Sequence, residues 1–288
     1  YTIEEKKIIY KFNFYKKKFK KINKKLKFVI KDNIIYVSDN LGYLYALNYK
    51  EKRVLWAKNY KVPFRSNIKI FKNKLILADQ DNTLYILDKM SGERLKTLPT
   101  EEIILKNNFE NSISIGEKSI FFLNTYGSLY SVNINKSKIE WFLNLNPSLD
   151  LNTGNQFSSN PVILYEDILI VSSVPYLYVL NAKNGSTIFK RPITSIIKPI
   201  ISGKNLFLIT KDYLLVCIDL DTNNVKYSIN INKEIANYLN TKEKLISIKS
   251  FEILNNKLHI FLDNSFIIVL DPTGKIEDIS KLKTKIKS

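Results

Sequence analysis

The chain of 288 residues has very few of the side chains from which most catalytic and metal sites are built. Its single cysteine, Cys217, excludes an internal disulfide. Its single histidine, His259, excludes most zinc sites and histidine relays. Both residues stand in strand-like patterns, which predicts structural roles. No run of about 18 apolar residues is present, so no segment is expected to span a bilayer.

Motifs for phosphate binding and nucleophilic catalysis are also missing. Neither glycine-rich phosphate loop occurs, and there is no Gly-x-Ser-x-Gly elbow of the kind found in serine hydrolases. The recurring acidic residues stand in turns rather than in a calcium-binding cluster, namely Asp79, Asp81, Asp88, Asp263 and Asp271. We therefore predict a protein that is not an enzyme, with no catalytic residues, no metal site and no cofactor.

Arginine is scarce although the chain is strongly basic. Only four of the 45 basic residues are arginine: Arg53, Arg65, Arg94 and Arg191. Proteins that read nucleic acids favour arginine for bidentate contacts, so the net charge of +18 does not predict a nucleic-acid partner. Lysine, asparagine and isoleucine share A/T-rich codons, which explains the basicity. The densest lysine run, at 16–25, is expected to be a solvated loop. Its alternative role is contact with an anionic membrane or an acidic partner.

A pattern of the form Leu-Tyr-Ala-Leu-Asn recurs six times along the chain. Successive copies are 40, 45, 48, 38 and 52 residues apart, measured between the terminal residues Asn48, Asp88, Asn133, Asn181, Asp219 and Asp271. We call these six residues the anchors. A period of about 40–50 residues, built from short strands separated by Gly, Asn and Asp, is typical of a β-propeller.

Each copy predicts the same local structure. In the first copy, residues 33–38, 43–47 and 53–57 are expected to be successive strands. A glycine follows the anchor by four residues at Gly92 and Gly185, where a turn needs a positive φ. Eight residues after the anchors stand Trp56, Lys96, Trp141, Phe189, Tyr227 and Ile279. Because a ring recurs at this position, we expect it to pack between neighbouring blades rather than to stack on a ligand.

We predict one all-β domain over residues 1–288, a β-propeller of about seven (six to eight) four-stranded blades. Full repeats cover about residues 33–280. Residues 7–31 are expected to form an outer strand, with Tyr10 at the aromatic position, and the basic loop of a first blade. That blade is either partial or completes the last one and closes the ring.

The spacing Asn/Asp-x-x-x-Gly-x-x-x-Trp after Leu-Tyr-Ala-Leu resembles the pyrroloquinoline-quinone-like (PQQ-like) repeat family of propellers. This resemblance implies a quinone-binding quinoprotein, or its remnant, as one alternative. Quinone-dependent enzymes of that family carry a vicinal cysteine pair, which one cysteine cannot supply. Both tryptophans, Trp56 and Trp141, also stand at the packing position.

The longest interruption of the repeat, at 144–162, contains Asn-Leu-Asn-Pro-Ser-Leu-Asp-Leu. Loops of this length inside a propeller tend to be functional. This segment is similar to the Pro-Ser-Leu-Ser-Leu-Arg loop of the BamB family of outer-membrane assembly factors, in which two leucines and an arginine contact the partner. Leu149 and Leu151 match the leucines, whereas Asn152 stands at the arginine position and lacks its charge. The alternative is an inert loop whose leucines pack back onto the blades.

The BamB resemblance implies a non-enzymatic scaffold of the outer-membrane β-barrel assembly machinery in the periplasm of a Gram-negative bacterium. It implies that the partner is the periplasmic part of BamA, bound through inter-blade loops. It also implies outer-membrane association through a lipid anchor upstream of the printed sequence. A third possibility is a propeller interaction module of a larger receptor or sensor protein.

Overall fold

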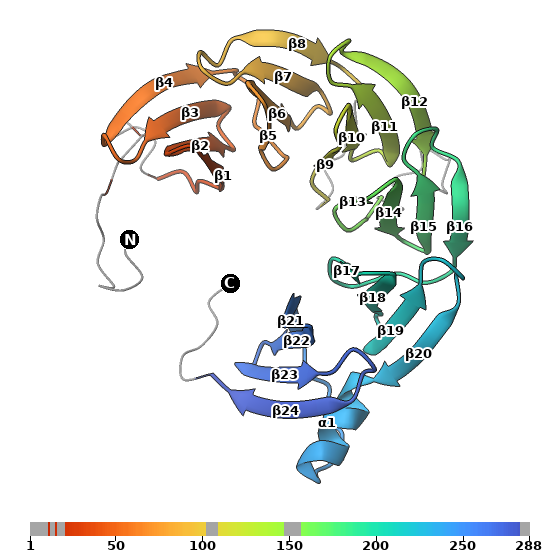
Figure 1. Cartoon of the computed structure of the whole chain (residues 1–288). Coiled ribbons are helices and arrows are strands. Elements are labelled where there is room, and N and C mark those ends of the chain that lie inside the picture. Colours follow the sequence, from red (N-terminus) through yellow and green to blue (C-terminus); the bar gives the residue numbers. More distant parts are fainter. Residues whose placement is uncertain (1–10, 12–14, 16–20, 102–108, 147–156, 283–288) are drawn as a thin grey trace. The chain divides into compact units, whose positions relative to one another are not determined.

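The computed structural model describes residues 11, 15, 21–101, 109–146 and 157–282. In this part of the chain, 24 strands form six four-stranded antiparallel sheets (Figure 1). The all-β prediction is confirmed, and the six sheets lie within the predicted range of six to eight blades. The chain divides into two compact units, Tyr1–Phe157 and Ser158–Ser288, with three sheets each. The single domain over residues 1–288 stays a prediction.

The first unit contains three sheets whose strands follow one another in sequence order. Its first sheet consists of β1 (Leu26–Lys31), β2 (Ile34–Asp39), β3 (Tyr43–Asn48) and β4 (Arg53–Asn59). Its second sheet consists of β5 (Lys69–Phe71), β6 (Lys74–Ala78), β7 (Leu84–Asp88) and β8 (Arg94–Leu98). Its third sheet consists of β9 (Ser112–Ile115), β10 (Ser119–Leu123), β11 (Ser128–Asn133) and β12 (Lys138–Asn144).

The second unit repeats this arrangement and adds one helix. Its first sheet consists of β13 (Ile163–Tyr165), β14 (Ile168–Ser173), β15 (Tyr176–Asn181) and β16 (Thr187–Arg191). Its second sheet consists of β17 (Ile200–Ser202), β18 (Asn205–Ile209), β19 (Leu214–Asp219) and β20 (Val225–Asn230). After the helix α1 (Ile231–Leu239), its third sheet consists of β21 (Ile248–Leu254), β22 (Lys257–Leu262), β23 (Phe266–Leu270) and β24 (Ile276–Lys281).

The six anchors make the turns that the sequence predicts. Five anchors are the last residue of the third strand of their sheet, and Asp271 directly follows its strand. Each anchor accepts backbone N–H bonds through its side-chain oxygen from residues two to four positions ahead. Such bonds start a turn without help from the rest of the fold. A β-bulge then recurs in all six sheets where the third strand pairs with the fourth. The turn chemistry of the repeat is therefore confirmed in every copy.

The core lies between consecutive sheets within each unit. In the first unit, Tyr36 and Leu44 of the first sheet pack in one cluster with Leu75 and Leu77 of the second. In the second unit, corresponding clusters join β14 and β15 to β18 and β19, and β18 and β19 to β22 and β23. The middle sheet of each unit therefore packs against a neighbour on each face, and its second and third strands are largely buried.

Two of the predicted packing rings lie against the turn of the next sheet. Trp56 of β4 covers Gly92, and its Nε1 donates to the Lys89 carbonyl at 3.2 Å. Tyr227 of β20 covers Gly274. The Tyr227 hydroxyl donates to the Pro272 carbonyl at 2.8 Å. In both cases the accepting carbonyl belongs to the residue that directly follows an anchor. The inter-blade packing role is thus confirmed for both rings.

The structure corrects one boundary and adds one element. Residues 7–31 were expected to hold an outer strand and a basic loop, but Leu26–Lys31 form β1, the first strand of a complete sheet. Pairing with β2 makes this possible, since Phe28 lies opposite Val37 and Ile30 opposite Ile35. The proposed strand around Tyr10 lies outside the described residues. The helix α1 was not expected; Asn230 caps it, and Ile231 and Ile235 bury one face.

The two scarce residues lie in strands, as predicted. Cys217 in β19 is 1% exposed within a core cluster, and burial raises the pKa of its thiol. His259 lies in β22, with Nδ1 3.2 Å from the Lys257 carbonyl. Neither residue belongs to a reactive constellation in the described part of the chain.

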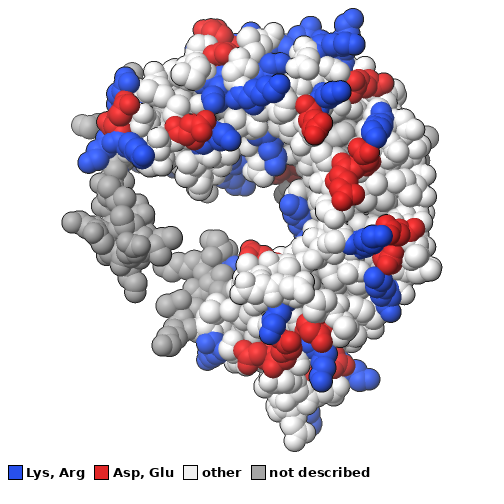
Figure 2. Space-filling view, viewed as in Figure 1, with Lys and Arg blue, Asp and Glu red and all other residues white. Residues whose placement is uncertain are grey.

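Charged side chains of both signs lie close together over the face shown in Figure 2. Exposed ion pairs in the described residues include Lys183 with Asp167 and Arg53 with Glu51. Pairs of this kind contribute about 0–1 kcal/mol each. They distribute charge over the surface more than they stabilise the fold.

In the first unit, Glu101 follows the second sheet and bonds to the third. Its carboxylate accepts hydrogen bonds from Asn124 at 2.8 Å, Ser128 at 2.9 Å and Tyr130 at 2.6 Å. Burial alone raises the pKa of Glu101, but bonds from Tyr130, its own backbone, Ser128 and Asn124 outweigh burial and lower the pKa. The ionised form of Glu101 therefore connects neighbouring sheets.

We expect Glu101→Gln to lower the free energy of unfolding by about 1–3 kcal/mol near neutral pH, because a charged acceptor of several bonds is lost. A carboxyl group with a lowered folded pKa contributes stability above its unfolded pKa, and this contribution is lost as pH falls through the folded pKa. The stability gap between wild type and variant should therefore narrow below about pH 4.3. Urea unfolding at neutral and acid pH measures the gap, and a gap that does not depend on pH would contradict this role.

Candidate partner-binding site

The predicted binding residues Leu149, Leu151 and Asn152 lie outside the described residues. The structure does confirm the interruption that contains them, since β12 ends at Asn144 and β13 begins at Ile163. The last residues of this connection, from Ser158 onward, belong to the second unit and are described. They line a pocket, so a hollowed surface directly follows the predicted loop along the chain.

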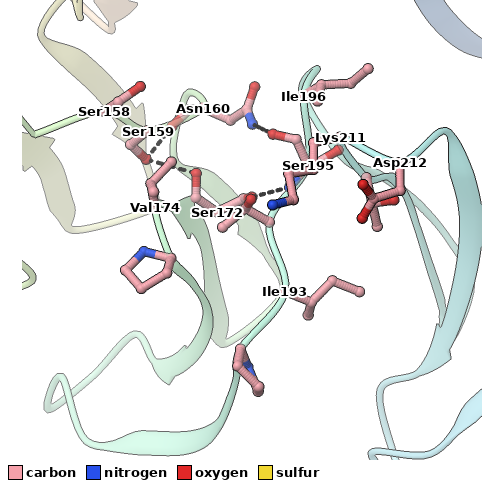
Figure 3. A pocket seen from close by; sticks show the side chains of 14 residues that line it. Ser158, Ser159, Asn160, Ser172, Val174, Ile193, Ser195, Ile196, Lys211 and Asp212 are labelled. Carbon is pink, nitrogen blue, oxygen red and sulfur yellow. Dashed lines mark hydrogen bonds between the residues drawn. The ribbon is translucent and has the colours of Figure 1, made fainter.

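The pocket has a volume of about 530 Å³ and lies between the first two sheets of the second unit (Figure 3). Four connections form it: residues 158–160 before β13, the β14–β15 turn at Val174 and Pro175, residues 192–196 after β16, and the β18–β19 turn at 210–212. Because the strands alternate in direction, all four connections lie at the same end of their sheets. Loops held in this way on a rigid scaffold are common binding surfaces.

Hydroxyl, amide and backbone groups hold the floor of the pocket in place, and Figure 3 shows some of their hydrogen bonds as dashed lines. The Ser195 N–H donates to Ser172 Oγ at 2.8 Å, and Ser195 Oγ accepts from the Ile209 N–H at 3.1 Å. Asn160 Nδ2 donates to the Ser195 carbonyl at 2.6 Å. Ser195 therefore connects β14 of one sheet to β18 of the next and positions the connection between them.

Sequence reasoning did not identify these serines. Ser66, Ser159 and Ser195 each stand shortly before the first strand of a sheet, and each bonds the backbone of the second strand. A serine that recurs just before the predicted sheets was the available signal. It recurs in both units, so its main role is to hold the connections between sheets.

The rim of the pocket is apolar, with charge on one side only. Val174 and Ile196 are 58% and 42% exposed, and Ile193 also lines the pocket. Lys211 and Asp212 are both exposed in the β18–β19 turn, and they are the only charged residues among those that line the pocket. Figure 3 shows Asp212 on the opposite side of the pocket from Val174.

The polar groups of the pocket floor hold its loops in place. The Ser172 and Ser195 hydroxyls are occupied by backbone groups, and no histidine lines the pocket. Within the described residues, no group of three or more His, Cys, Asp or Glu side chains is placed to hold a metal ion. In the same part of the chain, no helix has the length and apolar character needed to cross a membrane.

Several solved structures share this fold at low sequence identity. BamB from Moraxella catarrhalis matches with a TM-score of 0.73 and 13% identity, over 89% of this chain and 76% of that one. The computationally designed protein Ika8 matches with a TM-score of 0.67 and 12% identity, over 91% and 76% of the two chains. The C-terminal WD40 domain of Sif2 matches with a TM-score of 0.64 and 13% identity, over 91% and 73%. These likenesses show a β-propeller fold.

Comparison with curated protein sequences gives no significant match. The family model for the outer membrane protein assembly factor BamB, however, matches residues 13–228, which is most of the chain. The matched region includes four of the six sheets, most of a fifth, the long interruption and the whole pocket. With its repeated four-stranded sheets and recurring turn anchors, this protein belongs to the BamB family of PQQ-like repeat β-propellers.

Proposed function

We propose that this propeller is a non-enzymatic scaffold of the outer-membrane β-barrel assembly machinery and binds the periplasmic domains of a BamA-like protein. The family match supports this role. The observation that carries the proposal is the position of the pocket: the loop with Leu149 and Leu151 leads directly into the residues that line it. A few apolar anchors carry most of the binding energy in many specific protein interfaces.

The proposal places the protein in the periplasm, associated with the outer membrane. A scaffold needs a rigid frame and exposed loops, and the sheets with their buried cores supply the frame. Catalysis has no part in this role. Asn152 stands where the family has an arginine, so we expect the two leucines to contribute most of the binding energy of the loop.

We expect Leu149→Glu and Leu151→Glu each to abolish capture of the periplasmic domains of BamA from the same organism, because a carboxylate would be desolvated at an apolar contact. Pull-down and biolayer interferometry measure this loss. Leu254→Glu is the matched control, since Leu254 is a 47% exposed leucine at the end of β21 and receives the same charge.

Circular dichroism and thermal unfolding of the three variants separate lost binding from lost folding. Normal capture by both loop variants would contradict the assignment of the loop. Equal loss of capture in Leu254→Glu would show that added charge, rather than the position of the leucine, is responsible.

A further inference from the structure

The pocket of the second unit contains a side-chain acceptor with a defined orientation. Asn160 Nδ2 must be the nitrogen that faces Ser195, because a carbonyl oxygen can only accept a hydrogen bond. The amide oxygen therefore faces away from Ser195, as Figure 3 shows. It is available to accept an N–H from a bound molecule.

The other features of the pocket define what that molecule carries. Val174, Ile193 and Ile196 provide an apolar surface wide enough for an aliphatic side chain. The adjacent turn carries Lys211 and Asp212, and no ion pair is formed by either residue within the described part of the chain. A cation and an anion are thus consecutive residues at the edge of the apolar part of the pocket.

The net charge of the chain indicates which of these two residues, Lys211 or Asp212, forms an ion pair with the bound molecule. At +18, the protein attracts acidic partners and repels basic ones over long range. An acidic side chain that arrives at the pocket gains an ion pair with Lys211. Asp212 would repel the same acidic side chain, and this repulsion limits how closely the acidic side chain approaches Asp212.

We propose that this pocket binds an extended segment of the protein partner in which an aliphatic side chain is followed or preceded by an acidic residue. The aliphatic side chain occupies the hollow beside Ile196, the acidic group pairs with Lys211, and a backbone N–H of the segment donates to Asn160 Oδ1. This inference rests on the proposed function, because it describes a second contact of the same partner.

The two neighbouring charges provide a test with opposite expected signs. We expect Lys211→Gln to weaken binding of the BamA periplasmic domains about twofold to fivefold at low salt, and Asp212→Asn to strengthen it by a similar factor. Both effects should shrink at high salt. Lys118→Gln, an exposed lysine of the first unit outside the pocket, controls for the change in net charge.

Ile196→Ser tests the apolar part of the pocket. The Ile196 N–H bonds the Ile209 carbonyl at 2.7 Å through the backbone, so this substitution keeps the connection in place. We expect binding to weaken at least tenfold with an unchanged unfolding midpoint. Isothermal titration calorimetry of all four variants against the wild type measures these changes.

The results distinguish the two proposals. If the wild type binds and the Leu149→Glu variant does not, but the pocket variants bind like the wild type, the proposed function holds and the pocket inference is wrong. Lys211→Gln and Asp212→Asn effects of the same sign would also overturn the pocket inference. If the wild type does not bind the BamA domains, the proposed function is wrong and the pocket inference is overturned with it.

Discussion

Gly92→Ala is expected to lower the free energy of unfolding by about 2–4 kcal/mol, of which about 1–2 kcal/mol is backbone strain. Gly92 has a φ of +69°, where a side chain is unfavourable. An alanine Cβ there would lie 2.8 Å from the ring of Trp56, which is closer than real contacts allow. The ring would have to move, and its bond to the Lys89 carbonyl would be lost. Urea unfolding measures the change.

Gly203→Ala is the matched control for the backbone part of this effect. Gly203 has a φ of +54°, but a Cβ there meets nothing within 4 Å. We therefore expect a loss of only about 1 kcal/mol, from backbone conformation alone. Gly92→Ala should also become milder in a Trp56→Ala background, since the ring is then absent. Equal losses at Gly92 and Gly203 would show that the Trp56 contact contributes nothing.

Phe122→Ala should lower the free energy of unfolding by about 3–5 kcal/mol, the largest loss expected of any substitution discussed for this chain. Phe122 lies in β10, is 1% exposed, and packs in the cluster between the second and third sheets of the first unit. Its ring stacks on Tyr130, with the ring centroids 6.4 Å apart. Truncation leaves a cavity that close-packed sheets cannot collapse to fill. Chemical unfolding by urea measures the loss.

Phe142→Ala offers a direct comparison on the same sheet. Phe142 in β12 also stacks on Tyr130, with the ring centroids 5.8 Å apart, but its side chain is 63% exposed. Its removal should cost less than about 1 kcal/mol, because little apolar surface returns to water. A loss at Phe142 as large as that at Phe122 would mean that Phe142 is covered in solution.

The turns could be predicted from the sequence because their causes are local. An anchor such as Asp88 accepts bonds from the N–H groups of Met90 and Ser91, two and three residues ahead. Its role can therefore be predicted from a few consecutive residues. The strand β1 was harder to identify. Its lysines and apolar residues resemble a solvated basic segment, and only pairing with β2 makes it a strand. The helix α1 was missed because its turn-forming neighbours looked like another loop.

The candidate site also has one part that the sequence identified and one part that only the structure shows. The sequence singled out the interruption with Leu149 and Leu151 because a repeat makes its own gap visible, and their contact with a partner stays a prediction. It could not identify the pocket, whose walls come from residues as far apart as Ser158 and Asp212. Nor could it show that Ser195 bonds two sheets at once.

By itself, the sequence determined the repeat, the turn chemistry and the positions of the rings, because each depends on residues that are neighbours along the chain. Only the tertiary structure decided what those rings and loops contact. Trp56 meets Gly92, and Asn160 meets Ser195, because stacking brings the end of one sheet against the next. Contacts of that kind depend on how whole sheets pack, and no local pattern of residues records the distance between them.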